Sequence, residues 1–269
     1  MRTFPLIAIT IVFAASLLIS PWAVAAMNQN EFVDLCLQGT PEEVEAAVKA
    51  GADPNAPARD GQTPLSMAAR DILATNALKK VEILLKAQAD PRAAIPAEEN
   101  GSVIQVAAAA SNTELVKRLI ELGVNVNQAD DSGHTPLISA CIRQSRSEIR
   151  KNQAALIVKM LLEAGADPKA GTDRNVTALL YAAEADNTEV IRLLLAAGAD
   201  VNAVAKNLET PLLKAALDSS DPEAVRLLLE AGANVNAAKR NETPLTNARQ
   251  NRTPAAKAII KMLEEAGAK

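Results

Sequence analysis

The residues that most often carry chemistry in proteins are few in this 269-residue chain, and they are far apart. His134 is the one histidine, and Cys36 and Cys141 are the two cysteines. A zinc site needs several such ligands at short spacing, and nucleophilic catalysis needs a base beside the nucleophile. His134 stands at the base of a loop and is interpreted as hydrogen-bonded or solvent-facing. The inventory therefore predicts no metal site, no cofactor and no catalytic residues.

Short motifs that bind ligands or activate nucleophiles are also missing from the sequence. It contains no glycine-rich phosphate loop and no GxSxG nucleophile elbow. The segment DDSG at 130–133 lacks the alternating oxygen ligands and distal glutamate of a calcium loop, so we predict a turn. Asn100, Asn175 and Asn241 begin Asn-X-Ser/Thr triplets two residues before a recurring Thr or Ser. We expect left-handed turn residues there rather than glycan acceptors.

The elements that must position any functional surface are contained in one 33-residue unit, residues 177–209. Thr177 is predicted to cap a short helix, and a second helix with a wide apolar band is expected from about Glu189. Gly198 is expected to end that helix in the left-handed conformation, before a loop of small and polar residues. Because one such unit cannot bury its own apolar surface, it requires copies on both sides.

Copies of this unit cover nearly the whole chain. TPL recurs at 63–65, 135–137, 210–212 and 243–245, and GADPN, GVNVN, GADP, GADVN and GANVN begin at 51, 123, 165, 198 and 232. The predicted starts are Asn30, Thr63, Ser102, Thr135, Thr177, Thr210 and Thr243. This pattern resembles the ankyrin repeat family. The resemblance implies an all-α solenoid of about seven helix-turn-helix units with extended, β-hairpin-like finger loops, forming one domain over residues 27–269.

Three units depart from the common pattern. The first lacks TPL and is interpreted as the N-terminal cap. The second has Gln88 where the others have glycine, so we expect either a left-handed glutamine or a different turn. The fourth has nine extra residues between its helices, in the charged stretch 143–154. That stretch is either a tolerated extension of a helix pair or a protruding contact for a partner.

The repeat phase also places the two cysteines. Cys36 and Cys141 each follow a predicted repeat start by six residues, three units apart. With layers about 10 Å apart they are separated by roughly 30 Å, far beyond the ~7 Å limit for a disulfide. We therefore predict two separate buried thiols rather than a bridge or a metal pair.

Residues 1–26 fall outside the repeats and have the layout of a signal peptide. A basic residue precedes a 14-residue apolar run over 6–19, and small residues follow at the end of the segment. The run is shorter than the ~20 residues that span a bilayer. We expect cleavage after Ala25 or Ala26, a periplasmic or secreted protein, and no stable membrane insertion after cleavage. An uncleaved anchor and translation from Met27 are the alternatives.

The chain after residue 26 is acidic and poor in aromatic residues. It carries 27 basic and 32 acidic residues, a net charge of −5, and its aromatic residues are Phe32 and Tyr181. Nucleic acid binding favours a basic face with aromatic platforms. The sequence therefore predicts no nucleic acid partner. The resemblance implies instead that another protein binds a concave face made of finger tips and inner helices.

Candidate contact residues follow from the resemblance and lie mainly in units four to six. They are Ile142, Arg143, Arg174, Val176, Tyr181, Lys206, Leu208, Leu217 and Arg240. The apolar members are side chains that the repeat phase does not oblige to be buried. They either form a binding hot spot ringed by charge or fold down between the layers.

The finger tips differ in charge along the chain. In order, the six tips are Arg59-Asp60, Glu98-Glu99, Asp130-Asp131, Asp173-Arg174, Lys206-Asn207-Leu208 and Lys239-Arg240. Acidic residues dominate the second and third fingers, and basic residues dominate the last three. This polarity either sets the register of a bound partner or is a chance distribution of solubilising charge. Asp71 is expected at a contact position at the end of an inner helix.

Several functions are consistent with this sequence. The first hypothesis is a non-enzymatic, exported protein-protein interaction scaffold. A narrower form, implied by resemblance to some bacterial ankyrin proteins, is an inhibitor, immunity or protective accessory protein of a co-exported enzyme. The second is a small-ligand-binding or catalytic groove, which needs ionisable groups converging in a pocket. The third is a passive structural repeat in the cell envelope. The residues do not specify the partner or the oligomeric state.

Overall fold

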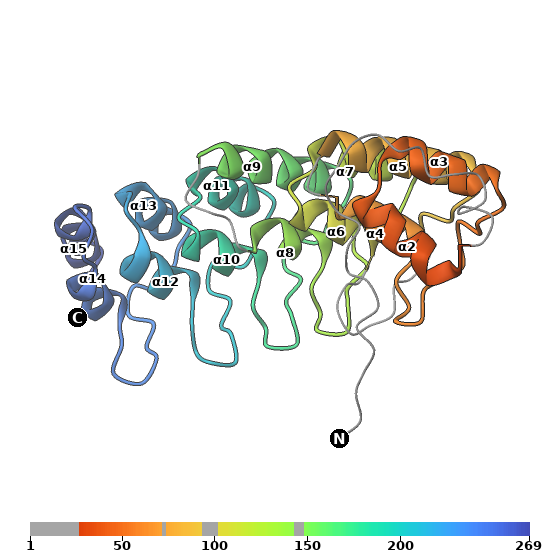
Figure 1. Ribbon diagram of the computed structural model, residues 1–269. Helices are drawn as coiled ribbons and strands as arrows, with labels where there is room; N and C mark the ends of the chain where they lie inside the picture. Colours follow the sequence, from red (N-terminus) through yellow and green to blue (C-terminus); the bar gives the residue numbers. More distant parts are fainter. Residues whose placement is uncertain (1–26, 72–73, 93–101, 143–147) are drawn as a thin grey trace, which may run out of the picture.

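The computed structural model describes residues 27–71, 74–92, 102–142 and 148–269, and within them the helices form seven pairs (Figure 1). The inner helices are α2 (Gln29–Gln38), α4 (Pro64–Ala69), α6 (Val103–Ala109), α8 (Pro136–Cys141), α10 (Ala178–Glu184), α12 (Pro211–Asp218) and α14 (Pro244–Gln250). The outer helices are α3 (Pro41–Lys49), α5 (Ala74–Lys86), α7 (Thr113–Glu121), α9 (Glu148–Glu163), α11 (Thr188–Ala196), α13 (Pro222–Glu230) and α15 (Ala256–Glu265). The prediction of an all-α solenoid of about seven helix-turn-helix units is confirmed.

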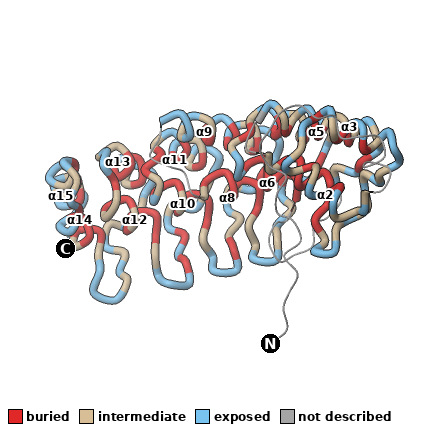
Figure 2. Tube along the Cα trace, in the orientation of Figure 1, coloured by how far each residue is buried: buried red, intermediate tan, exposed pale blue. Residues whose placement is uncertain are grey.

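Each helix pair packs mainly against its neighbours in the stack. Inner helices contact the next inner helix, from α2 against α4 to α12 against α14, and outer helices do the same from α3 to α15. In Figure 1 the outer helices form the upper row, and the loops hang below the inner helices as fingers. Buried residues lie between the layers, whereas the finger tips are exposed (Figure 2). The core is therefore a continuous strip along the stack.

Local signals start and stop the helices of each unit. The Oγ1 atom of Thr177 accepts a hydrogen bond from the backbone N–H of Leu180 at 3.3 Å, which caps α10 as predicted. Gly198 takes a φ of +88° after α11, in the region that a side chain would strain. Gln88 takes a φ of 68° at the equivalent place after α5. The left-handed conformation expected for Gly198 is confirmed, and of the two alternatives for Gln88 the structure has the left-handed glutamine.

The first repeat begins earlier than predicted. Its helix α2 starts at Gln29 behind the cap Asn28, and Asn30 lies inside the helix. The cause is a capping box, in which the Asn28 side chain accepts from the N–H of Glu31 at 3.2 Å and the Glu31 carboxylate accepts from the N–H of Asn28 at 2.9 Å. Two unpaired helix donors are satisfied in this way, so the helix extends beyond the shared phase.

The left-handed residues before the repeat starts are only partly those that were expected. Asn175 takes a φ of 54°, as predicted. In the last finger the left-handed residue is Arg240, with a φ of 55°, so the prediction for Asn241 is wrong. There the finger closes as a tight turn in which Lys239 and Glu242 exchange two backbone hydrogen bonds of 2.9 Å. Asn100 is outside the described residues.

Cys36 in α2 and Cys141 in α8 are both buried and free. Burial raises the pKa of each thiol to about 12, with the charge of Lys80 opposing the rise at Cys36. Because the thiolate is the reactive form, both side chains are unreactive in the folded protein. The prediction of two separate buried thiols is confirmed.

Outer helices are longer in the second and fourth units. Helix α5 has 13 residues and α9 has 16, against nine in α3, α7, α11 and α13. Ile149 and Leu156 of α9 are 71% and 50% exposed. Part of the extra length of these units therefore continues the outer helix, on the side of the stack opposite the fingers (Figure 1). Residues 143–147, including Arg143, are outside the described residues.

Asparagine side chains tie successive loops together across the layers. Asn127 donates from Nδ2 to the carbonyl of Gly165 at 2.9 Å and accepts at Oδ1 from the N–H of Asp167 at 2.8 Å. Three further asparagines make the same pair of bonds to the next loop: Asn55, Asn202 and Asn236. Arg92 and Lys169 stand at this position in the other two loops. This ladder therefore spans four of the six loop-to-loop boundaries.

Candidate functional site

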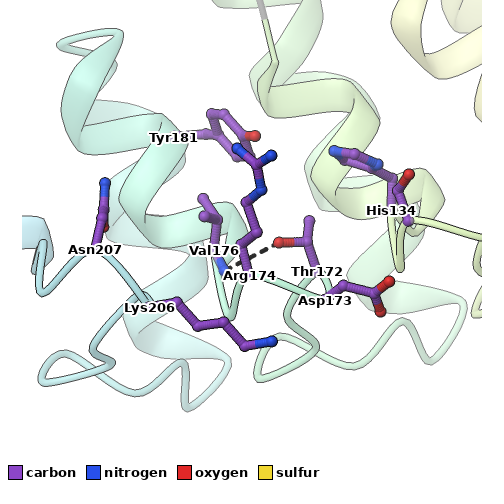
Figure 3. A pocket seen from close by; sticks show the side chains of 9 residues that line it. His134, Thr172, Asp173, Arg174, Val176, Tyr181, Lys206 and Asn207 are labelled. Atoms are coloured by element: carbon purple, nitrogen blue, oxygen red, sulfur yellow. Dashed lines mark hydrogen bonds between the residues drawn. The ribbon is translucent and has the colours of Figure 1, made fainter.

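A groove of about 740 Å³ opens between three neighbouring fingers and helix α10 (Figure 3). The third finger contributes Ser132 and His134, and the fifth contributes Lys206 and Asn207. The fourth finger contributes Thr172, Asp173, Arg174 and Val176, and helix α10 contributes Tyr181. The repeat fold brings these residues together because it stacks the fingers side by side. Polar finger tips form the sides of the groove, and Tyr181 and Val176 form its apolar part.

Four predicted contact residues line this groove: Arg174, Val176, Tyr181 and Lys206. Arg174 and Lys206 are exposed, and Val176 and Tyr181 are half-buried. Tyr181 also packs against the core, so this candidate hot-spot residue is partly folded down between the layers.

The remaining predicted residues lie outside the groove. Leu208, which takes a left-handed φ of 66°, is 48% exposed at the tip of the fifth finger, and Arg240 is exposed in the sixth. Ile142 and Leu217 are half-buried at the ends of α8 and α12, and Ile142 packs on the core. The structure therefore separates the eight candidates that it describes into a groove set and a dispersed set, and Arg143 lies outside the described residues.

Backbone hydrogen bonds fix the spacing of the three fingers. The N–H of Asp173 donates to the carbonyl of Ser132 at 2.9 Å, and the N–H of Lys206 donates to the carbonyl of Arg174 at 2.8 Å. Asn175 adds a bond from Nδ2 to the carbonyl of Val204 at 2.7 Å. The sides of the groove are therefore held by bonds to the main chain, and these bonds do not use the Arg174 and Lys206 side chains, which line the groove.

Several charged side chains beside the groove form ion pairs with one another. Glu209 contacts Lys239 at 3.0 Å and Lys214 at 3.6 Å, and Lys214 contacts Glu184 at 3.3 Å. Partial burial acts to raise the pKa of Glu209, but hydrogen bonds from Lys239 and Asn207 and the nearby lysine charges lower it overall.

Tyr181 is a neutral hydrogen-bond donor in this setting. Burial, with the nearby Glu184 carboxylate, raises the pKa of the phenol, and the charge of Arg174 opposes that rise. Figure 3 shows the Arg174 side chain reaching up toward Tyr181. The pair therefore offers a cation and a phenol hydroxyl at one place, next to an apolar ring.

His134 was considered only in isolation in the sequence, yet it lines the groove. Its Nδ1 atom lies 3.4 Å from Oδ1 of Asp130, and its carbonyl accepts from Nε2 of Gln105 at 2.5 Å. The DDSG segment is the predicted turn, with the Asp130 side chain accepting from the N–H of Ser132 at 2.9 Å and Gly133 at a φ of 79°. Asp173 and Asn207 belong to the finger tips named from the sequence. Ser132, His134 and Thr172 could also have been found from the repeat phase, because each stands one to five residues before a recurring threonine.

A buried ion pair in the second unit was also missed. The Lys80 ammonium is fully buried, lies 2.7 Å from Asp71 and donates to the carbonyls of Cys36 and Leu37 at 3.0 and 3.1 Å. Only 9% of the Asp71 side chain is exposed, so its predicted place on the contact surface is wrong. The signal was present in the sequence, since Lys80 is in phase with the buried Ala77, Val81 and Leu84 of α5.

The described residues contain no group of three or more His, Cys, Asp or Glu side chains arranged to hold a metal ion. Ser132 and His134 make no hydrogen bond to each other through their side chains. A serine nucleophile needs such a contact with its base. The groove offers a ligand two cations, a carboxylate, a phenol and an apolar patch.

The family model for ankyrin repeats in three copies matches residues 72–151, 104–205 and 148–239. These matches together span more than half of the chain. The chain belongs to the ankyrin repeat family. Ankyrin repeats indicate a protein-protein interaction scaffold, and such domains are generally non-catalytic.

Solved and curated ankyrin proteins are similar to this one over different lengths. A crystal structure of an ankyrin repeat domain from Acinetobacter baumannii AYE has a TM-score of 0.61 and 33% identity, covering 77% of this chain and 98% of that one. Mouse "Ankyrin repeat, SAM and basic leucine zipper domain-containing protein 1" is 37% identical over 46% of this chain and 25% of its own length. The Arabidopsis thaliana "E3 ubiquitin-protein ligase KEG" is 28% identical over 61% of this chain and 10% of its own length. The ankyrin chain therefore spans a quarter or less of these two relatives.

Ankyrin repeats typically bind protein partners. Across the helices that the structure describes, none has the length and apolar character needed to cross a membrane.

Proposed function

We propose that this ankyrin repeat protein is a non-enzymatic scaffold that holds a partner protein against its fingers and inner helices. The observation that carries the proposal is the groove between the third, fourth and fifth fingers, which combines Arg174 and Lys206 with the apolar surface of Tyr181 and Val176. A central aromatic anchor ringed by charge is the usual energetic pattern of a protein interface.

Export is the second part of the proposal. It is supported by the basic residue, apolar run and small residues of segment 1–26, which have the order of a signal peptide. A fusion of this segment to a reporter active only outside the cytoplasm should be active, and the exported protein should begin at Ala26 or Met27. Loss of reporter activity on placing two arginines within the apolar run is the matched control.

The scaffold proposal is tested by crosslinking and pull-down from the exported fraction of the source cells. One stoichiometric partner should be recovered, and it should be lost from the Tyr181→Ala, Leu208→Ala variant. The control is Ile149→Ala with Leu156→Ala, which trims an exposed apolar pair from α9, away from the fingers.

Three results would contradict this proposal, the first of them only the location of the contact surface. Equal loss of the partner in both variants would show that the fingers are not the contact surface. Turnover of a substrate by the pure protein, or no partner under crosslinking, would favour the small-ligand or passive structural alternatives. Identifying the partner as an enzyme whose activity falls on binding would establish the narrower inhibitor function.

A further inference from the structure

The groove is lined by two cations, Arg174 and Lys206, and by one exposed carboxylate, Asp173, so its lining has an excess of positive charge. Lys214 and Lys239 beside it are each paired with Glu209. Arg174 and Lys206 have no ion-pair partner in the part of the chain that the structure describes, and both are exposed. Arg240, which occupies in the sixth finger the position that Arg174 occupies in the fourth, is exposed as well. Positive groups therefore continue along the finger row toward the C-terminal end.

The opposite end of the groove has the other charge. Asp130 and Asp131 precede Ser132 in the third finger, and Asp131 is exposed. An acidic ligand would be repelled there and attracted toward the fifth and sixth fingers. Charge complementarity of this kind fixes the direction of a bound chain more than it adds affinity.

The chemistry of the individual groups selects carboxylates. Arginine presents a rigid fork of donors that matches a carboxylate in two parallel hydrogen bonds, and lysine adds a point charge. The Tyr181 hydroxyl stays protonated, since its pKa is raised, and can donate a further bond. The ring of Tyr181 and the side chain of Val176 offer an apolar surface beside these donors (Figure 3).

We infer that this groove binds an extended, acidic segment of the partner protein, so the inference rests on the proposed function. Separate acidic side chains of the segment pair with Arg174 and with Lys206, an adjacent apolar or aromatic side chain lies on Tyr181 and Val176, and the acidic residues continue toward Arg240. The finger-to-finger backbone bonds hold the groove in place before binding, which reduces the entropy lost on association.

The test selects ligands from a display library of random 12-residue peptides on the full chain. Enriched peptides should carry Asp or Glu within two residues of an apolar or aromatic residue. Arg174→Glu with Lys206→Glu should weaken binding of a selected peptide by about tenfold or more, because hydrogen bonds to charged groups are the stronger ones. The same variant should select peptides rich in Lys and Arg.

A matched control and a local probe make the test specific. Arg59 occupies in the first finger the position that Lys206 occupies in the fifth, and it is also exposed, so Arg59→Glu should leave the affinity within about twofold, as expected for a charge remote from the contact. Tyr181 is the one tyrosine of the chain, so fluorotyrosine labelling gives a single fluorine resonance in the groove. That resonance should move when the peptide binds.

Three outcomes would overturn the inference: enriched peptides without an acidic bias, no enriched peptides, or equal competition by a twelve-nucleotide thymidine strand, which would indicate unspecific attraction of polyanions. If any of these occurs while crosslinking still traps a partner that Tyr181→Ala with Leu208→Ala loses, the acidic segment is refuted and the scaffold stands. If crosslinking also fails, both are refuted.

Discussion

The asparagine ladder predicts that Lys169→Asn will stabilise the protein. Lys169 stands in the loop after α9 where Asn127 stands in the loop after α7. Its N–H already donates to the side chain of Asp167 at 2.8 Å, as the N–H of Asn127 donates to Asn125 at 3.0 Å. Because the two loops share this turn, an asparagine at 169 can reach the carbonyl of Gly198 and the N–H of Asp200 without rearranging the backbone.

The magnitude follows from the two bonds that the substitution would add. A net protein hydrogen bond contributes about 0.5–1.5 kcal/mol, and these bonds are exposed, so we expect the lower half of that range for each and about 1–2 kcal/mol in total. For a chain of this size, 1 kcal/mol corresponds to a melting-temperature change of about 2–4 °C. Asn127→Ala removes an existing pair of such bonds at another loop, so it should lower the free energy of unfolding by a similar amount.

Urea unfolding followed by far-ultraviolet circular dichroism measures both effects. Lys169→Ala is the control, because it removes the lysine charge without adding a rung. Lys169→Asn should unfold at a higher urea concentration than Lys169→Ala. If the two unfold together, or if Asn127→Ala unfolds with the unmodified protein, the ladder does not stabilise the stack. A broader transition in Asn127→Ala would show that the rung also couples neighbouring repeats.

Three further predictions concern buried and charged groups. Lys80→Met leaves Asp71 without its buried counter-ion and should cost about 3–5 kcal/mol in urea unfolding, part of which Asp71→Asn in the same chain should restore. Cys36 and Cys141 should not react with a thiol reagent at pH 8 in the folded protein and should both react in urea, because burial raises each pKa to about 12; a reactive folded thiol would contradict this. The pKa of Glu209 is lowered on folding, so its stabilising effect is present above the unfolded value of about 4.3 and is lost as the pH falls through the folded value. The difference in melting temperature between the unmodified protein and Glu209→Gln should therefore shrink below about pH 4, and a constant difference would refute the assignment.

The repeated framework could be predicted from the sequence because its signals are local. A threonine that caps its own helix and a glycine that ends the next one act over a few residues, and seven copies reinforce each other. The first helix was placed two residues late because Asn28 and Glu31 cap it outside the shared phase. Lys80 was missed because its buried charge is compensated partly by a distant group. Its ammonium donates to the carbonyl of Cys36, 44 residues away in sequence, as well as pairing with Asp71.

The groove could be predicted only in part. The repeat phase assigns Arg174 and Lys206 to finger tips and Tyr181 to an inner helix, but it does not say which tips converge. That depends on hydrogen bonds between fingers, such as the one from the Lys206 N–H to the Arg174 carbonyl. Ile142 and Leu217, chosen by the same reasoning, lie at the ends of α8 and α12 and do not line the groove.

The asparagines of the ladder and the side chains that line the groove are separate sets, and this separation has a consequence for binding. Asn127 and Lys169 lie in the loop segments below the outer helices, whereas Arg174 and Lys206 are positioned by their own finger-to-finger bonds. Lys169→Asn should therefore raise the melting temperature without changing the affinity for a selected acidic peptide. Arg174→Glu with Lys206→Glu should lower the affinity for that peptide and leave the melting temperature unchanged, because both side chains are exposed and lack ion-pair partners among the described residues. A stability variant that also changed the peptide affinity would show that the groove depends on how the whole stack bends rather than on its local contacts.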